Sequence, residues 1–131
     1  MINQDTICAV ATAQGGAIGI IRVSGPEAIA ITSSIFLPVQ EKVKLQEKEA
    51  YTLTFGKICK GEEVIDEVLV SLFRAPHSYT GEDSTEISCH GSSYILQQLM
   101  QLLIEKGCRS ALPGEFTQRA FLNGKMDLSQ A

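Results

Sequence analysis

Three charged residues stand where a charge is unusual and could hold a ligand. Arg22 ends an otherwise apolar strand face, Glu86 is the one charge on a polar strand face, and Lys125 lies in a turn after a predicted helix. A guanidinium or ammonium group can pair with an anion, and a carboxylate can accept two parallel N–H donors. From spacing alone, however, structural roles are favoured: a structural carboxylate partner for Arg22, solvent for Glu86, and a surface position for Lys125.

The sequence lacks the residue patterns of phosphate-binding loops, dinucleotide sites, nucleophilic sites and metal sites. No GxxxxGK[ST] phosphate-binding loop occurs, and Gly16 and Gly19 lead into a strand rather than a helix, which favours a tight turn over a dinucleotide site. Cys89 and His90 are neighbours in a predicted strand, so they point to opposite faces, and no third group completes a nucleophilic site. His77 and His90 are too few for a metal site. We therefore predict no catalytic residue and no metal ligand in this chain.

Composition indicates a single folded domain. The 131 residues are 44% hydrophobic and 20% charged, values that are ordinary for soluble globular proteins, and no apolar run approaches the length of about 18 residues that spans a membrane. The net charge of −4 argues against tight nucleic-acid binding by this chain alone. No secretory signal begins the sequence, and the scattered cysteines indicate buried thiols rather than disulfides or zinc ligands. A cytoplasmic protein without membrane contact is expected.

The first part of the chain predicts a hairpin followed by a helix. Thr6 to Ala11 and Ala17 to Ser24 read as strands, with Arg22 on the opposite face of the second strand from Ile21. Ser24-Gly25-Pro26 predicts a helix start, and the apolar spacing continues to about Phe36. The segment from Val39 to Ala50 is interpreted as a solvated connection.

The middle of the chain predicts a second hairpin and a further strand. Tyr51 to Ile58 alternates with Tyr51, Leu53 and Phe55 on one side, and Val64 to Phe73 is a longer apolar strand. Arg74 to Asp83 has no periodicity and is interpreted as a surface loop that could hold binding groups. Ser84 to Cys89 alternates again, so Glu86 should point away from the core.

The last third predicts two helices and a short strand. Ser92 to Lys106 has a clear apolar stripe, Cys108 to Leu112 could form a short strand, and Glu115 to Asn123 a short helix. Glu115 and Arg119 are four residues apart, which suits an ion pair on a helix surface. The order of elements predicts an α+β fold with a mainly antiparallel sheet and packed helices.

The chain ends on the start of another predicted helix. Asp127 and Gln130 have nearly the spacing of a helix-capping box, which leaves only a few helical residues before Ala131. Isolated helices shorter than roughly 12 residues are marginal in water. We therefore expect the chain to be the N-terminal piece of a longer protein, with residues 1–126 as its first domain and residues 127–131 as the start of a helical domain.

A long motif near the end resembles a known family. The stretch from Pro113 to Leu128 (PGEFTQRAFLNGKMDL) closely resembles the N-terminal domain of the MnmE (TrmE) family of tRNA modification GTPases. The resemblance covers nearly the whole chain, with residues 38–61 unremarkable. It includes Asp5-Thr6-Ile7 with Ala11-Thr12, the segment GIIRVSG from Gly19, and SYTGED from Ser78 with Glu86 and His90-Gly91.

The resemblance implies a folate-binding domain. Its fold would be similar to the tetrahydrofolate-binding domain of the glycine-cleavage T-protein and of dimethylglycine oxidase. Arg22, Glu86 and Lys125 match the positions that contact a tetrahydrofolate derivative in the family, which would be 5,10-methylenetetrahydrofolate or 5-formyltetrahydrofolate. Glu86 is assigned to the two adjacent donors of the pterin ring. The carboxylates of the glutamate tail could pair with Arg22 or Lys125, and the sequence leaves open which of the two does so and whether either instead meets the pterin or its one-carbon unit.

The resemblance also implies partners. The domain would form a homodimer, and the full-length protein would work with the flavin-dependent protein MnmG (GidA) to modify C5 of the wobble uridine in tRNA with a folate one-carbon unit. GTP, magnesium and potassium would bind only in a GTPase domain beyond this chain. Two alternatives remain: an assembly module that binds folate only in the full-length dimer, and direct recognition of tRNA.

Overall fold

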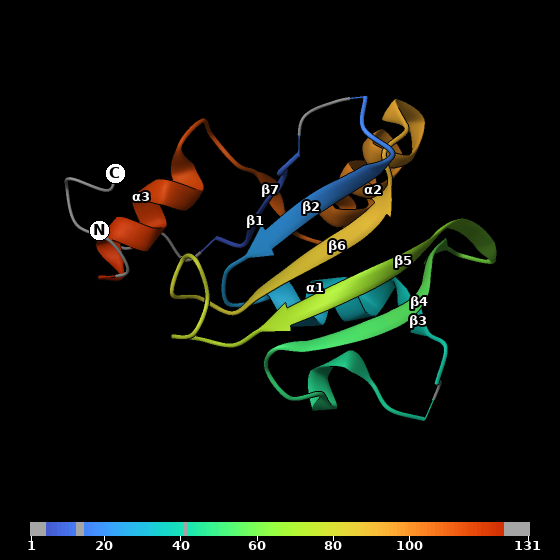
Figure 1. Ribbon diagram of the computed structural model, residues 1–131, viewed down its shortest axis with the longest axis horizontal. Coiled ribbons are helices and arrows are strands. Elements are labelled where there is room, and N and C mark those ends of the chain that lie inside the picture. The colour runs from blue at the N-terminus through green and yellow to red at the C-terminus, as the bar shows by residue number, and fades with distance from the viewer. Residues whose placement is uncertain (1–4, 13–14, 41, 125–131) are drawn as a thin grey trace.

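The computed structural model describes residues 5–12, 15–40 and 42–124. Seven strands form one sheet in the order β3-β4-β5-β6-β2-β1-β7 (Figure 1). Neighbouring strands are antiparallel except β1 and β7, which are parallel. The elements are, in chain order, β1 (Ile7–Val10), β2 (Ile18–Ser24), α1 (Ala28–Ile35), β3 (Phe36–Pro38), the 3-10 turn η1 (Leu45–Glu47), β4 (Thr52–Lys60), β5 (Glu63–Phe73), β6 (Ser84–His90), α2 (Ser93–Glu105), β7 (Arg109–Ser110) and α3 (Glu115–Leu122). The fold is α+β, as predicted.

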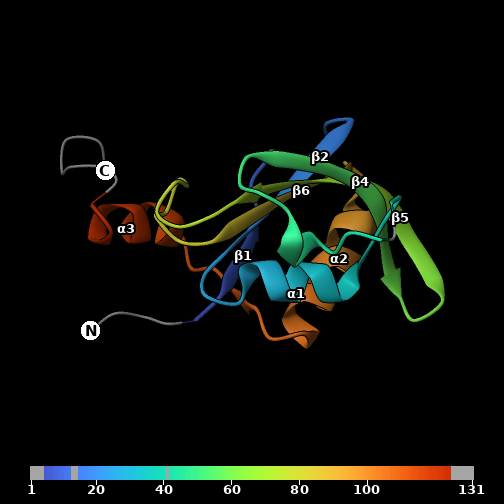
Figure 2. The ribbon, with the colours of Figure 1, turned by 90° about the horizontal axis from the view of Figure 1, so that it is seen from below.

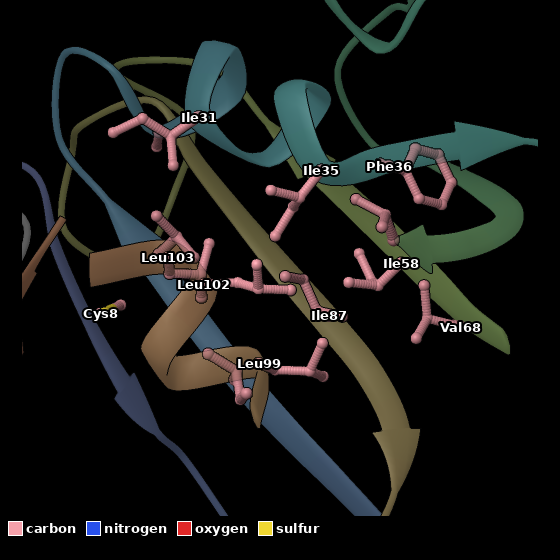
Figure 3. Close-up of a cluster of buried hydrophobic side chains, with 14 of the residues drawn as sticks. Cys8, Ile31, Ile35, Phe36, Ile58, Val68, Ile87, Leu99, Leu102 and Leu103 are labelled. Atoms are coloured by element: carbon pink, nitrogen blue, oxygen red, sulfur yellow. The ribbon is translucent and has the colours of Figure 1, made fainter. Parts of the chain in front are cut away.

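Helices α1 and α2 cover one face of the sheet (Figure 2). Alternate residues of the central strands point toward them, because successive side chains of a strand lie on opposite faces. Ile87 of β6 and Leu99 of α2 are both fully buried in this layer (Figure 3). The helices contribute apolar stripes at helical spacing, as predicted, and together these side chains form the hydrophobic core.

Both predicted hairpins form. β1 pairs with β2, and β4 pairs with β5 around a turn in which Gly61 has a φ of +61°, a conformation that glycine adopts without strain. β6 lies between β5 and β2, which brings the two hairpins into one sheet. The central strands therefore come from three separate regions of the sequence.

The segment after α1 differs from the prediction. The helix ends at Ile35, and Phe36–Pro38 forms the edge strand β3, paired with β4. The ring of Phe36 packs over Gly56, where an added Cβ would lie 2.5 Å from Phe36 Cε1. Leu45 of η1 is only 1% exposed, so the connection also contributes to the core. The sequence predicted that the helix would continue to about Phe36, and it did not predict β3. Within the segment from Val39 to Ala50, which was interpreted as a solvated connection, Leu45 is the exception because it is buried.

The other face of the sheet carries exposed apolar side chains. Leu53 and Phe55 of β4 alternate as predicted but are 63% and 69% exposed, because Thr54, Gly56 and Ile58 are the β4 residues on the helix side. Ile18 of β2 is 64% exposed. This open sheet face is therefore where strand side chains meet solvent.

Helix α3 lies apart from α1 and α2, beyond the end of the sheet where β2 ends (Figure 1). Its buried residues are Glu115, Arg119 and Ala120. The predicted ion pair between Glu115 and Arg119 forms, with Arg119 Nη2 3.5 Å from Glu115 Oε2. Its predicted surface position is wrong, because both residues are buried, at 6% and 5% exposure. None of the helices in the described part of the chain is both long and apolar enough to span a membrane.

Candidate ligand site on the open sheet face

Arg22 and Glu86 lie directly opposite each other on neighbouring strands. The register of β2 against β6 pairs them, and Arg22 Nε donates to Glu86 Oε2 at 3.0 Å. Their side chains are 28% and 26% exposed, on the face that the helices leave open. The sequence predicted an outward direction for Glu86 and a carboxylate partner for Arg22, but not that each would be the other's partner.

Two aromatic rings contact the Arg22 guanidinium. Its Cζ atom lies 5.1 Å from the ring centroid of Tyr79, in the loop after β5, and 5.6 Å from that of Phe116, in α3. A guanidinium over an aromatic face is attracted by the ring quadrupole. The rings also restrict the side chain, so Arg22 is held by an ion pair and by two apolar contacts. Sequence reasoning missed both aromatic residues, although both lie inside the motifs SYTGED and PGEFT.

A small cavity opens beside this pair. It has a volume of about 140 Å³ and is lined by Arg22, Phe73, Tyr79, Ser84 and Glu86. A second hollow of about 310 Å³ shares Phe73 and Tyr79 with it and is lined also by Tyr51, His77 and Ser78. The loop of residues 74–83, which the sequence indicated as a place for binding groups, contributes Tyr79 to both hollows and His77 and Ser78 to the second.

The hydrogen-bonding groups at the cavity are partly unused. Within the described residues, neither the Arg22 nor the Glu86 side chain makes a hydrogen bond other than the one between Arg22 Nε and Glu86 Oε2. Two guanidinium nitrogens and one carboxylate oxygen thus lack a protein partner in this part of the chain. Such a site can bind a planar molecule that presents N–H donors to the carboxylate and stacks on a ring.

Lys125, the third predicted site residue, lies outside the described residues. Helix α3 ends at Leu122, and Gly124 follows with a φ of +74°. The relation of Lys125 to Arg22 and Glu86 stays a prediction. The predicted helix start at Asp127 lies outside the described residues as well.

A partly buried ionic cluster connects α3 to Arg109 of β7 and to Glu82 in the loop before β6. Arg119 Nη1 donates to both carboxylate oxygens of Glu82 at 3.2 Å, and Arg109 donates to both oxygens of Glu115 at 3.0 and 2.6 Å. These bonds from Arg109, the largest cause, hold the pKa of Glu115 at about 2, against its ordinary 4.5. Ser24 Oγ donates to Glu82 at 2.9 Å, which connects the cluster to the end of β2.

The remaining reactive side chains have structural contacts. Cys89 is 5% exposed, and burial, with a smaller effect of Asp66, raises the pKa of its thiol to about 11. It is therefore protonated at neutral pH, which agrees with the argument against a cysteine nucleophile. His90 Nδ1 lies 2.7 Å from Asp66 Oδ1. Among the described residues no group of three or more His, Cys, Asp or Glu side chains could hold a metal ion.

Comparison with known proteins identifies the family. The model of the family described as "GTP-binding protein TrmE N-terminus" matches residues 6–125. The chain is 80% identical over 130 residues to the tRNA modification GTPase MnmE of Bacteroides thetaiotaomicron and 78% identical over 130 residues to that of Bacteroides fragilis. In both cases the match covers 99% of this chain and 28% of the relative.

A third relative extends the comparison to another genus. The tRNA modification GTPase MnmE of Phocaeicola vulgatus is 65% identical over 164 residues, covering 100% of this chain and 33% of that protein. The chain therefore spans about a third or less of the length of these relatives. The site residues Arg22, Glu86, Tyr79 and Phe116 all lie within the matched range of 6–125. Because this family model matches most of the chain, the chain belongs to the TrmE N-terminus family.

Proposed function

We propose that this domain binds a tetrahydrofolate derivative, 5,10-methylenetetrahydrofolate or 5-formyltetrahydrofolate, at Arg22 and Glu86. The observation that carries the proposal is the Arg22–Glu86 pair, at 3.0 Å, beside a cavity walled by aromatic rings. A carboxylate that accepts two adjacent N–H donors, next to a ring on which a flat heterocycle can stack, suits a pterin. The fold of the T-protein and dimethylglycine oxidase folate domains is part of the same proposal.

The contact between the two residues limits how folate can lie. The pterin and the glutamate tail of folate are separated by the whole p-aminobenzoyl group. Because Arg22 and Glu86 are in contact, they cannot meet opposite ends of the molecule. With the pterin on Glu86, Arg22 meets the pterin or its one-carbon unit, and the tail carboxylates are left to Lys125. Glu86 Oε2 retains a second lone pair for the ligand while it accepts from Arg22.

The cavity is suited to one end of the ligand. Its volume of about 140 Å³ is below the roughly 300 Å³ at which pockets for drug-sized molecules begin, so a pterin ring is a better match than a whole folate. The rest of the molecule would extend over the adjoining hollow of about 310 Å³ beside His77 and Ser78. The open face and a second copy of the domain would enclose it.

Calorimetric titration with 5-formyltetrahydrofolate tests the site. We expect Glu86→Ala and Arg22→Ala each to weaken binding roughly 10- to 100-fold, the usual effect of losing a hydrogen bond to a charged group. Lys57→Ala, which removes an exposed charge elsewhere on the open face, should leave the affinity unchanged. Unchanged affinity in both site variants would contradict the assignment.

We propose further that the domain forms a homodimer within a longer protein. The open sheet face, with Leu53 and Phe55 more than half exposed, supports this because exposed apolar patches mark interaction surfaces. In that protein the folate would supply a one-carbon unit for modification at C5 of the wobble uridine of tRNA, together with the flavoprotein MnmG (GidA). GTP, with magnesium and potassium, would bind and be hydrolysed in a separate domain. The relatives are tRNA modification GTPases by name, which supports this setting.

The same open face favours a second candidate, an assembly module that binds folate only in the full-length dimer. Sedimentation equilibrium combined with the titration separates the two. A monomer that binds folate would favour an autonomous ligand domain, whereas a dimer that does not bind it would favour the assembly module. Salt-sensitive tRNA binding by the domain would instead favour direct tRNA recognition.

A further inference from the structure

Helix α3 is attached to the rest of the domain largely by polar contacts. Of its three buried residues only Ala120 is apolar, while Phe121 and Leu122 are 37% and 64% exposed. A helix at a protein surface usually buries an apolar stripe, and α3 lacks one. Its position therefore depends on the ionic and hydrogen-bonding groups beneath it.

Arg119 is the centre of those contacts. Its side chain is 6% exposed and donates through Nη1 to both oxygens of Glu82 and, at 2.6 Å, to the carbonyl oxygen of Asp5. Nη2 lies 3.5 Å from Glu115 Oε2. Glu82 in turn accepts from Ser24, which follows Arg22 by two residues on β2. A buried charge that is bound on several sides occupies one orientation, because leaving it unpaired is costly.

The loop that contains Glu82 and helix α3 meet again near the ligand site. The hydroxyl oxygens of Tyr79 and Thr117 lie 3.0 Å apart, and Asn123 Nδ2 donates to the carbonyl oxygen of Thr80 at 2.9 Å. These contacts join the two segments that place Tyr79 and Phe116 against the Arg22 guanidinium. Displacement of α3 would therefore remove Phe116 from the site.

We infer that Glu82 and Arg119 form a positioning pair for the ligand site. Neither residue hydrogen-bonds to Arg22 or Glu86; the pair fixes α3 and residues 78–83 to the end of β2 and so sets the aromatic contacts that hold Arg22. The part of the inference that concerns affinity rests on the proposed folate binding. The geometric part does not, because the environment of Tyr79 can be measured without ligand.

Two measurements on the purified protein test the pair. Glu82→Gln and Arg119→Lys are titrated with 5-formyltetrahydrofolate by calorimetry. The same variants, labelled with 3-fluorotyrosine, are examined by ¹⁹F NMR; the chain has three tyrosines, and Tyr51→Phe and Tyr94→Phe assign the signals. Asp66→Asn is the matched control. The side chain of Asp66 is 8% exposed and pairs with His90, the last residue of β6, whereas Glu82 lies just before the first residue of that strand. The substitution therefore removes another buried carboxylate, at the far end of β6 from Glu82.

We expect each single variant of the pair to bind 5-formyltetrahydrofolate roughly tenfold more weakly than the parent protein. The double variant should have about the affinity of the weaker-binding single variant, because both substitutions remove the same Glu82–Arg119 interaction. The ¹⁹F signal of Tyr79 should shift while that of Tyr94 stays in place. Asp66→Asn should change neither quantity. This combination separates positioning from general loss of stability, which would affect all tyrosines alike.

An unshifted Tyr79 signal in the folded variants, or affinity within about twofold of the parent, would overturn the inference. If Arg119→Lys does not fold, Glu82→Gln decides alone, because it leaves the arginine paired with Glu115. Failure of the parent protein to bind folate would contradict the proposed function, and the Tyr79 signal would still test the positioning pair.

Discussion

Glu115 shows how strongly the surroundings of one residue can change its chemistry. Its side chain is 7% exposed, it accepts two bonds from Arg109, and it also accepts from the backbone N–H of Leu112 at 2.9 Å. Such a carboxylate is stable in its charged form because its donors replace water. Arg119 adds a second positive charge, because its Nη2 lies 3.5 Å from Glu115 Oε2, the oxygen that also accepts from Arg109 Nη2.

Glu115→Gln should lower the free energy of unfolding at neutral pH, and it should make that free energy less sensitive to acidification. The folded pKa of about 2 is below the ordinary 4.5, so the ionised carboxylate stabilises the fold above about pH 4.5, and that stability is lost as the pH falls toward 2. The variant should lose on the order of 3 kcal/mol at pH 7, since it leaves Arg109 and Arg119 incompletely paired. Urea unfolding at pH 7 and pH 3 measures both effects; an equal loss at the two pH values would contradict the argument.

The cysteines provide a second prediction at this scale. Cys8, Cys89 and Cys108 are buried, whereas Cys59 is partly exposed. Because the thiolate is the reactive form and burial raises the pKa of Cys89 to about 11, Cys89 should stay unmodified by a thiol reagent at pH 8 in the folded protein. We expect Cys59 to react first and the other three only on unfolding. Mass spectrometry of the labelled peptides gives the order, and rapid modification of Cys89 before Cys59 would oppose this account.

At the scale of elements, the edge strand β3 depends on a residue in its neighbour. Gly56 of β4 pairs with Pro38, and the space above it is filled by the ring of Phe36. A methyl group there would meet that ring and the carbonyl oxygen of Leu37. The strand can stay in place only if position 56 has no side chain.

Gly56→Ala should therefore destabilise the fold by about 1–3 kcal/mol, the usual cost of overpacking, by displacing β3 from β4. Chemical denaturation measures the loss, and hydrogen exchange should be faster at the amide of Val39, which follows β3 and donates to Phe55 O of β4 at 3.0 Å. Gly16→Ala is the control, because an added Cβ would have its nearest contact at 3.6 Å, with Ile18 O. An equal effect of the two substitutions would exclude the steric explanation.

At the scale of the whole molecule, the sheet has one covered and one open face. The helices α1 and α2 bury the first, and the second carries the Arg22–Glu86 pair together with exposed apolar side chains. A ligand site and an apolar patch on the same face suggest that ligand binding and assembly involve the same surface. This arrangement supports the proposed dimer.

The double variant Leu53→Lys, Phe55→Lys should shift the protein from dimer to monomer in sedimentation equilibrium. Lysines at these two positions of β4 would be desolvated without a partner in an apolar interface. In the monomer the same positions are 63% and 69% exposed and tolerate a charge. Tyr94→Lys, at a 64% exposed position in α2, should leave the assembly unchanged. A dimer that persists in the double variant would place the interface elsewhere.

Most elements could be predicted from the sequence because their signals are local. Alternation of apolar residues predicted the strands, helical spacing predicted α2, and Ser92 is its cap, accepting from Ile95 N at 3.1 Å. Edge strand β3 was missed because only three residues form it, and its pairing with β4 spans about twenty positions of the chain. The direction of Glu86, away from the core, was also predictable from the strand period alone.

The sequence by itself determined the α+β class, the order of the main elements and the individual candidates Arg22 and Glu86. Only the tertiary structure decided that these two residues are partners, that Phe116 and Tyr79 flank the arginine, and that Glu115 and Arg119 are buried. The physical reason is the separation along the chain of the residues that interact. Periodicity depends on neighbours along the chain, whereas Arg22 and Glu86 are 64 residues apart and Arg119 and Glu82 are 37 apart, so their contacts depend on strand order and on where α3 packs.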